Sequence, residues 1–262
     1  MKGIIVAGGS GTRLHPLTLA FTKHLLPVYN KPMIYYPLTT LMLAGVDEVL
    51  IICKEEDLVL FQKLLGDGRD LGIAIEYAIQ SIPRGISDAV IIAESFIAND
   101  NFCLILGDNL LYGPGLGREL SKYAGRNGAI IFAYQVANPS AFGNIIFDTE
   151  GRVIKISEKP SNPLSNWAIP GIYFFDSTAV EKAKSQSLSE RNELEIVDLI
   201  NLYLTEGNLI ANKLPIGTAW LDLGTPKSLL EAGQFIQVIE ERQGIRIGDP
   251  FAIDSNLKRT NR

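Results

Sequence analysis

Residues that bind zinc or form disulfides are rare in this sequence. Among its 262 residues there are two cysteines and two histidines. Cys53 and Cys103 lie inside apolar runs without a paired spacing, so we expect buried free thiols in a reducing cytoplasm. His15 and His24 have no companions at ligand spacing. Because a Ser–His–Asp order, a nucleophile elbow and a metalloprotease helix are also missing, zinc and covalent chemistry are not expected.

The sequence also has no excess of positive charge and no long apolar run. A net charge of −5 argues against nucleic acid as a partner, and an acidic protein that binds a polyanion must gather its cations locally or use a metal. No apolar stretch reaches membrane-spanning length, and the run after Lys2 is too short for a signal peptide. We therefore expect a soluble cytoplasmic protein without a membrane partner. Its 47% hydrophobic and 20% charged residues are typical of a globular core.

The first half alternates short apolar runs with helical patterns. Strands are predicted at Gly3–Ala7, Glu48–Cys53, Ile73–Ile79, Phe102–Leu106 and Ala129–Val136. Helices are predicted at Pro32–Ala44, Glu55–Leu65, Ile86–Ile97 and Gly115–Tyr123. This alternation predicts an α/β fold, with a Rossmann-like, mostly parallel sheet flanked by helices. In such sheets ligands bind beyond the carboxyl ends of the strands.

The second half is richer in strands. A hairpin is predicted at Asn144–Asp148 and Arg152–Glu158, and further strands at Ala168–Asp176, Leu209–Pro215 and Thr218–Leu221, with helices at Glu195–Glu206 and Lys227–Gln243. No Pro/Ser-rich linker separates the halves, so we expect one unit over residues 1–245, with a β-rich elaboration over the open face of the sheet. The tail, residues 246–262, is polar and basic at its end, and from Gly248 on we expect it to be poorly ordered.

The segment Ala7–Leu14, Ala-Gly-Gly-Ser-Gly-Thr-Arg-Leu, is the most informative motif. Its glycines allow backbone N–H groups to turn toward one anion, and Arg13 adds a cationic fork. It lacks the Gly-Lys-Ser/Thr of a Walker loop, and Leu14 replaces the last glycine of the dinucleotide fingerprint. An ordinary strand-to-helix turn is the alternative. Lys23, ten residues after Arg13, favours a phosphate site.

Two aspartates follow apolar strands in similar contexts. Asp108 stands in Leu-Gly-Asp-Asn, and Asp222 stands in Trp-Leu-Asp-Leu-Gly-Thr-Pro. Carboxylates at strand ends suit Mg²⁺, which usually takes one or two protein oxygens. Each segment also suits a helix cap or an Asx turn, with Thr225 the better capping residue after Asp222.

Charged residues also mark a strand end and a helix start later in the chain. Lys159 ends a strand beside Pro160, and it is either a solvated side chain or a point charge on a phosphate. Glu193 and Glu195 most simply favour a helix N-terminus.

Together these motifs resemble the sugar-1-phosphate nucleotidylyltransferases, most closely those that transfer thymidylyl groups to glucose 1-phosphate. The resemblance runs from Met1 to about Gly244, in the family's order and spacing. Its blocks are the glycine loop, Lys-His-Leu-Leu-Pro at Lys23, Lys31–Pro37, Leu-Gly-Asp-Asn, Glu158-Lys-Pro, Glu193–Ile196, Trp220-Leu-Asp and Glu240–Gly244.

The resemblance implies a nucleotide half (1–140), a sugar-phosphate half (141–225) and a C-terminal helix (226–245). dTTP would be held by Gly8, Gly9, Ser10, Gly11 and Thr12 with Arg13 and Lys23, and its base would be read by Gln80 and Gly85. A carboxamide such as Gln80 suits the imide edge of thymine or uracil. Gly143, Glu158 and Gly171 would line the sugar site, Lys159 would bind the sugar phosphate, and Asp108 and Asp222 would hold Mg²⁺. Arg13, Lys23 and Lys159 would be the catalytic cations, and a homo-oligomer is implied.

Three departures from the family pattern bear on these expectations. Phe142 replaces a tyrosine found in many relatives, and Asp88 stands where relatives often have glutamine. The chain ends soon after Gly244, without the longer segment that builds a secondary nucleotide site and tetramer contacts in feedback-regulated relatives. The alternatives are the same chemistry with UTP or another sugar 1-phosphate, or a nucleotide-sugar-binding protein without catalysis.

Overall fold

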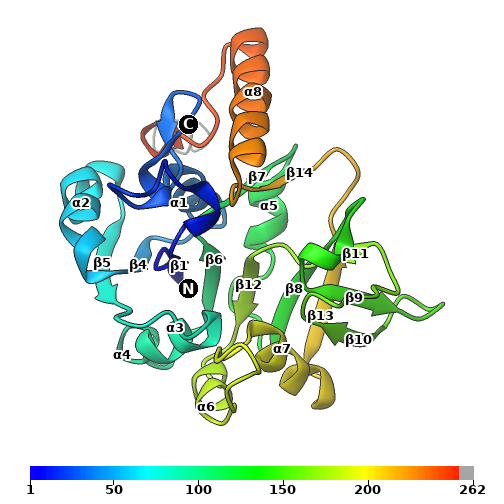
Figure 1. The fold of residues 1–262 in the computed structure, drawn as a ribbon. Coiled ribbons are helices and arrows are strands. Elements are labelled where there is room, and N and C mark those ends of the chain that lie inside the picture. Colours follow the sequence, from blue (N-terminus) through cyan, green and yellow to red (C-terminus); the bar gives the residue numbers. More distant parts are fainter. Residues whose placement is uncertain (254–262) are drawn as a thin grey trace.

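The computed structural model describes residues 1–253, and it is built on one ten-stranded sheet (Figure 1). Nine of the strands follow the order β10-β9-β11-β8-β12-β6-β1-β4-β5, and the tenth, β13, pairs with β8 off this path. The parallel half has β1 (Lys2–Val6) between β4 (Glu48–Cys53) and β6 (Phe102–Leu106), with β5 (Ala74–Ile79) at the edge. Beyond β6, β12 (Ile172–Phe175) runs antiparallel to both β6 and β8 (Ala129–Gln135). The predicted α/β fold with a parallel core is confirmed.

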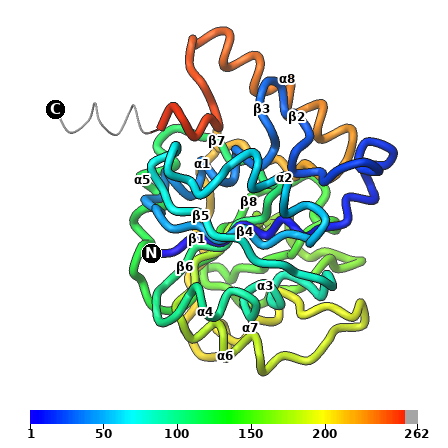
Figure 2. The backbone as a smooth tube through the Cα atoms, turned by 90° about the vertical axis from the view of Figure 1, so that its left-hand side faces the viewer, coloured from blue at the N-terminus to red at the C-terminus, as the bar shows by residue number. Residues whose placement is uncertain are grey.

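Helices cover both faces of this sheet (Figure 2). One face carries α1 (Tyr35–Leu43), α2 (Glu55–Leu65) and α5 (Leu116–Ser121), and the other carries α3 (Ile86–Ile92), α4 (Glu94–Ile97), α6 (Ala179–Lys184) and α7 (Ile196–Thr205). Successive strand residues point to opposite faces, so Ile5 packs in the first core and its neighbour Ile4 in the second. Both are fully buried, which explains why the central strands read as continuous apolar runs.

The β-rich segment continues the main sheet at one edge. Its strands are β11 (Trp167–Ala168), β9 (Asn144–Phe147) and β10 (Val153–Ser157), while β13 (Leu209–Lys213) pairs in parallel with β8. The turns at the ends of these strands carry several of the expected sugar-site residues.

A smaller assembly stands on the first face of the main sheet. It joins β7 (Asn109–Tyr112) and β14 (Ala219–Asp222) in a two-stranded sheet with α8 (Pro226–Gln243) and the hairpin β2–β3 (Pro27–Val28 and Lys31–Pro32). Thr225 caps α8 through a reciprocal capping box with Ser228, as predicted, and Pro226 occupies its first turn. Among residues 1–253, no helix is long and apolar enough to cross a bilayer.

Three predicted elements differ from the structure by more than one or two residues at an end. The helix expected at Pro32–Ala44 begins at Tyr35, because Lys31–Pro32 pairs with Pro27–Val28 instead. The helix expected at Ile86–Ile97 is divided at Ala93 into α3 and α4. The single strand expected at Ala168–Asp176 is two strands, because the chain leaves β11 after Ala168 and enters β12 at Ile172.

The start of the tail was also predicted wrongly. Asp249 is buried and accepts hydrogen bonds from Arg246 Nη1 and Phe251 N, and the segment 250–253 is helical. Ile247 and Ile253 are buried in apolar clusters. Apolar anchors therefore hold this part of the tail, and the rest of the expected disordered tail, 254–262, lies outside the described residues.

Candidate active site

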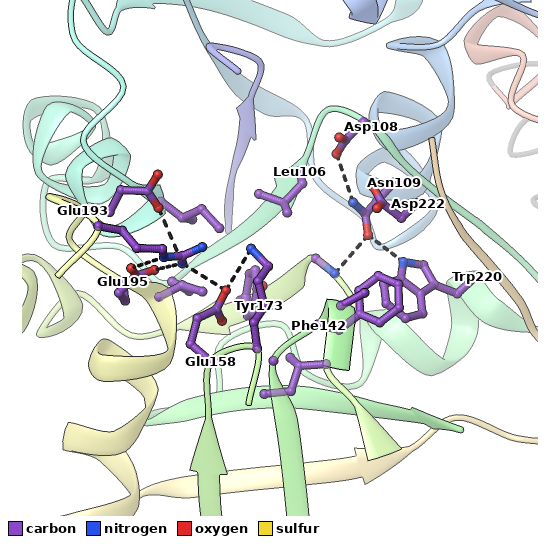
Figure 3. A pocket seen from close by; sticks show the side chains of 18 of the residues that line it. Leu106, Asp108, Asn109, Phe142, Glu158, Tyr173, Glu193, Glu195, Trp220 and Asp222 are labelled. Atoms are coloured by element: carbon purple, nitrogen blue, oxygen red, sulfur yellow. Dashed lines mark hydrogen bonds and ion pairs between the residues drawn. The ribbon is translucent and has the colours of Figure 1, made fainter. Parts of the chain in front are cut away.

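A cavity of about 480 Å³ lies beyond the carboxyl ends of β6 and β10 (Figure 3). Seven of the predicted site residues line it: Arg13, Asp108, Gly143, Glu158, Lys159, Gly171 and Asp222. They come from segments more than 200 residues apart in sequence, which the fold brings to the edge where α/β sheets bind ligands. The cavity is therefore the leading candidate for the active site.

Two carboxylates share one end of this cavity. Asp108 follows β6, and Asp222 ends β14 in register with Asn109. The Leu223 N–H donates to the Asp108 carbonyl oxygen at 2.9 Å, which fixes the two segments side by side. Burial, followed by the charge of Asp108, raises the pKa of Asp222 to about 6. The two carboxylates therefore repel each other, and a cation placed between them would relieve that repulsion.

Lys23 accompanies Asp108. Its Nζ lies 2.5 Å from Oδ2 of Asp108, and both side chains are largely buried. Burial alone would raise the pKa of Asp108, but the charges of Lys23 and His24 and the hydrogen bonds from Lys23 and Asn109 hold that pKa below its ordinary value. Asp108 therefore stays ionised, as a metal ligand must.

The donor set fits a hard cation that is shared with a ligand. Among residues 1–253, no group of three or more His, Cys, Asp or Glu side chains is arranged to hold a metal by itself. Two carboxylates are nevertheless the usual protein contribution to Mg²⁺, which takes its other ligands from water and substrate phosphates. Asp108 and Asp222 are thus suited to Mg²⁺ in the presence of a phosphate-bearing substrate.

The glycine loop has the properties of an anion site. Its backbone N–H groups, residues 8–13, donate no hydrogen bond to any other described group, so they are available to a ligand. Gly11 adopts φ 66°, which glycine takes without strain. A Cβ on Gly9 would lie 3.5 Å from Nζ of Lys23, so this ammonium group lies beside the loop. Gly9 and Ser10 line a second, smaller hollow with Lys54 and Asp57.

Arg13 carries a free positive charge into the cavity. It forms no ion pair among residues 1–253, and its guanidinium lies against Gly224, where a Cβ would come within 2.6 Å of Nη2. The same Cβ would be 3.4 Å from Oδ1 of Asp222. The charge of Arg13 lowers the pKa of Asp222, which opposes the effects of burial and Asp108. Gly224 therefore leaves the space in which Arg13 faces the carboxylate pair.

The opposite end of the cavity holds a cluster of glutamates and cations. Oε1 of Glu158 contacts Nζ of Lys159 at 3.1 Å and Nη2 of Arg191 at 3.2 Å. Arg191 also donates two hydrogen bonds to Glu195, from Nε at 3.0 Å and from Nη2 at 2.7 Å. Lys159 adopts φ 38°, an uncommon conformation for a residue with a side chain. Lys159 and Arg191 therefore both line the cavity, and each is paired with carboxylates of this cluster.

The floor between the two ends is built around Asn109. Its Oδ1 accepts hydrogen bonds from Gly171 N at 3.0 Å and Trp220 Nε1 at 2.6 Å, while Nδ2 donates to Asp108 at 3.2 Å. A Cβ on Gly171 would lie 2.6 Å from Leu106 and 2.9 Å from Oδ1 of Asn109, so only glycine fits.

A compact apolar wall and a second glycine complete the floor. Phe142 packs on Trp220 with ring centroids 4.9 Å apart. Gly143 is less crowded than Gly171, since its added Cβ would be 3.4 Å from Val197.

Gln80 and Gly85 lie outside the lining of this cavity. Gln80 is buried next to the glycine loop, and a Cβ on Gly8 would come within 2.9 Å of its Oε1. Gly85 has φ 101°, and a Cβ there would lie 2.4 Å from the carbonyl oxygen of Leu194. The glycine therefore allows the segment before α3 to pack on the segment before α7. The Leu194 N–H donates to the Arg84 carbonyl oxygen at 2.7 Å.

Arg191 is the main cavity residue that sequence reasoning missed. It stands in an irregular stretch before α7, with no glycine, aspartate or strand end to mark it. Glu193 and Glu195 were assigned only a helix-capping bias, and Glu195 is indeed the residue before the first turn of α7. Its buried carboxylate also holds Arg191, an acid–base pairing four residues apart that could have pointed to the arginine.

Comparison with known proteins places the chain in a family. Residues 2–238 match the family described as nucleotidyl transferase. In fold, the chain is similar to a UDP-glucose pyrophosphorylase solved with UDP-glucose, with a TM-score of 0.80 at 23% identity over 90% of this chain and 98% of that one. The chain belongs to the nucleotidyl transferase family.

Curated relatives narrow the class. The chain is 50% identical to a glucose-1-phosphate thymidylyltransferase of Mycolicibacterium smegmatis, over 97% of this chain and 88% of that protein. It is 52% identical to one of Neisseria meningitidis, over 94% and 86% respectively. A Bacillus anthracis protein solved with sucrose shares 35% identity and a TM-score of 0.85, over 96% of this chain and 99% of that one. Within the nucleotidyl transferases, the chain is a member of the glucose-1-phosphate thymidylyltransferase group.

Proposed function

We propose that this protein transfers the thymidylyl group of dTTP to glucose 1-phosphate, giving dTDP-glucose and pyrophosphate with Mg²⁺ as cofactor. The observation that carries the proposal is the single cavity in which Arg13, Lys159 and Arg191 face the carboxylates Asp108 and Asp222. Two polyanionic substrates and one divalent cation need this combination of charges.

The triphosphate is assigned to the glycine loop. Gly8, Gly9, Ser10, Gly11 and Thr12 offer unpaired backbone N–H groups, and Arg13 and Lys23 supply positive charge on either side. Gln80 and Gly85 read the base from the adjacent segment. Pyrophosphate, the leaving group, is therefore held by fixed donors and cations as its charge develops.

The sugar phosphate is assigned to the other end of the cavity. Lys159 and Arg191 bind its phosphate, while Glu158, Gly143 and Gly171 line the sugar. The Phe142–Trp220 wall gives an apolar surface where a tyrosine hydroxyl is common in relatives.

The reaction is a direct displacement at the α-phosphorus. A phosphate oxygen of glucose 1-phosphate forms the new P–O bond while the bond from the α-phosphorus to the bridging oxygen of pyrophosphate breaks. A phosphate monoester loses its second proton near pH ~6, so the nucleophile is already an anion and no general base is needed. This agrees with a cavity that no histidine lines. Four cationic side chains offset the repulsion between the two anionic substrates: Arg13, Lys23, Lys159 and Arg191.

Asp108 and Asp222 would hold Mg²⁺. When bound, Mg²⁺ supplies charge neutralisation on the phosphates and orients them for in-line attack. Lys23, paired with Asp108, keeps that carboxylate ionised and near the glycine loop.

A pyrophosphate-release assay tests the proposal. Purified protein is given Mg²⁺ with dTTP or UTP and a panel of sugar 1-phosphates. The proposal predicts release that requires Mg²⁺ and is fastest with dTTP and glucose 1-phosphate. A preference for UTP or another sugar would assign the same chemistry to other substrates. No release with any pair would identify a nucleotide-sugar-binding protein without catalysis.

Two properties of the whole protein are also proposed. The cytoplasm is the proposed compartment, since both cysteines are free and buried. Association into a homo-oligomer follows from the family resemblance, and light scattering on a size-exclusion column would measure it.

A further inference from the structure

Asp88 holds the amide of Gln80 in one of its two possible orientations. Nε2 of Gln80 donates to Oδ2 of Asp88 at 2.8 Å and to the Gly85 carbonyl oxygen at 3.2 Å. A carboxylate and a carbonyl only accept hydrogen bonds, so the NH₂ end of the amide must face them. Both Gln80 and Asp88 are buried, which makes the reversed orientation costly, because it would set oxygen against oxygen.

The oxygen end of the amide is left without a partner. No group among residues 1–253 donates a hydrogen bond to Oε1 of Gln80. This atom lies against the glycine loop, where a Cβ on Gly8 would come within 2.9 Å. A buried amide therefore presents a bare acceptor beside the loop that is assigned to the triphosphate.

An unpaired acceptor at this position distinguishes pyrimidine bases by whether N3 donates or accepts a hydrogen bond. Thymine and uracil carry a donor at N3, whereas N3 of cytosine is itself an acceptor. An oxygen facing N3 therefore favours thymine and uracil, and an NH₂ group in the same place would favour cytosine. The direction of the Gln80 amide thus decides which base is accepted.

We propose that Asp88 is a positioning residue for base selection, which fixes Gln80 so that its oxygen faces the base. The proposal rests on the proposed function, in which Gln80 contacts the base. Besides Gln80, Asp88 has a charged neighbour, Arg84, whose Nε lies 3.6 Å from Oδ1, and the Arg84 side chain is more than half exposed. Among residues 1–253 Arg84 donates no hydrogen bond to Gln80, so the orientation of the amide is assigned to Asp88 and Gly85.

The experiment compares D88N with the unmodified protein in the pyrophosphate assay, using dTTP, dUTP and dCTP at saturating glucose 1-phosphate. An asparagine is almost the same size but carries both a donor and an acceptor, so it removes the closer of the two acceptors that fix Gln80 and leaves only the Gly85 carbonyl, at 3.2 Å, against the reversed orientation. We expect the ratio of kcat/KM for dTTP over dCTP to fall by about tenfold. The ratio for dTTP over dUTP should not change, because the two bases share one edge. The loss with dTTP should appear mainly in KM.

Two variants control for indirect effects. R84Q removes the charged neighbour of Asp88 without touching Gln80, and D249N makes the same substitution at a buried aspartate outside the site. Both should keep the dTTP-to-dCTP ratio. The exchange Q80E/D88N places an acceptor-only group at 80 and a donor at 88, so it should restore the discrimination that D88N loses. If D88N does not fold, this exchange tests the same point.

The outcomes distinguish a failure of the proposed function from a failure of the role of Asp88. An unmodified protein that does not use dTTP would refute the proposed function. An active protein in which D88N lowers kcat/KM equally for dTTP and dCTP would refute the role of Asp88 alone. A Q80E/D88N protein that folds but accepts dCTP as readily as D88N does, or as readily as dTTP, would also refute it.

Discussion

At the scale of single residues, Asp222 shows how a functional charge differs from a structural one. Its carboxylate is disfavoured by burial and by Asp108, which together raise its pKa to about 6. Asp176 is the contrasting case, since Gly128 N, Thr178 N and the Tyr203 hydroxyl all donate to it. These hydrogen bonds outweigh burial and keep the pKa of Asp176 low. The first carboxylate needs a ligand, and the second is already satisfied.

Exchanging each aspartate for asparagine should therefore give opposite results. D222N is expected to lower kcat for pyrophosphate release at least about 100-fold, because a proposed Mg²⁺ ligand is lost, without lowering the free energy of unfolding. D176N should cost about 2 kcal/mol of stability and change kcat little. Urea unfolding and the pyrophosphate assay measure both. A D222N protein that keeps its activity would remove Asp222 from the metal site.

At the scale of elements, the sequence predicted the limits of those helices and strands that depend on a local pattern of apolar residues. The limits of β4, β6 and α2 match the prediction, because each is an apolar run or a clear helical stripe bounded by polar residues. β7 was not predicted, because it begins at Asn109 directly after the turn at Asp108 and its partner, β14, lies about 110 residues further on. Long-range pairing of this kind leaves little local signal.

The same distinction applies to the site. Asp108, Asp222 and the glycine loop were found because they stand at strand ends, which have a recognisable local sequence. Arg191 was not, because its place in the cavity depends on Glu158, which the tertiary structure brings to it from a distant strand end. The direction of the Gln80 amide likewise depends on contacts with Asp88 and Gly85 that no spacing indicates.

The contacts that attach α8 to the rest of the protein predict how its stability depends on pH. A buried carboxylate on this helix, Glu240, is bonded by Lys31 Nζ at 2.7 Å, Ile247 N at 2.7 Å and Asn30 Nδ2 at 3.0 Å. Burial would raise the pKa of Glu240, but these three bonds hold it below the ordinary 4.5. Its contribution to stability is therefore present above pH 4.5 and is lost as the pH falls through the lower folded-state pKa.

We expect E240Q to be less stable than the unmodified protein by about 3 kcal/mol at pH 7, because Lys31 is left buried without its partner. The difference should shrink progressively below pH 4.5. Urea unfolding at several pH values measures it. E241Q, at the exposed neighbouring position, should differ by less than about 0.5 kcal/mol throughout. A difference for E240Q that is constant with pH would contradict the assignment.

At the scale of the whole molecule, the two cysteines report on the integrity of the sheet. Burial raises the pKa of Cys53 to about 11 and raises that of Cys103 as well. Both side chains are completely buried, in strands β4 and β6 on either side of β1. Neither thiol can react until the centre of the sheet opens.

Ellman's reagent should therefore react with almost no cysteine in the native protein at pH 8, and with two cysteines per chain in guanidinium chloride. The slow reaction in native buffer should follow the rate of unfolding and should slow further when ligands stabilise the fold. A thiol that reacts within minutes in native buffer would show that the sheet opens locally.

The contact between Arg84 and Leu194 gives the whole molecule a further property. Two backbone hydrogen bonds, from Leu194 N to the Arg84 oxygen and from Ser87 N to the Leu194 oxygen, join the stretch proposed to read the base to the stretch that carries Arg191, and Gly85 is pressed against the Leu194 carbonyl. We therefore expect that order imposed on one stretch by its ligand is already present when a second ligand reaches the other stretch. We expect the binding of the two proposed substrates to be coupled in free energy, and linkage then requires each to raise the affinity for the other by the same factor.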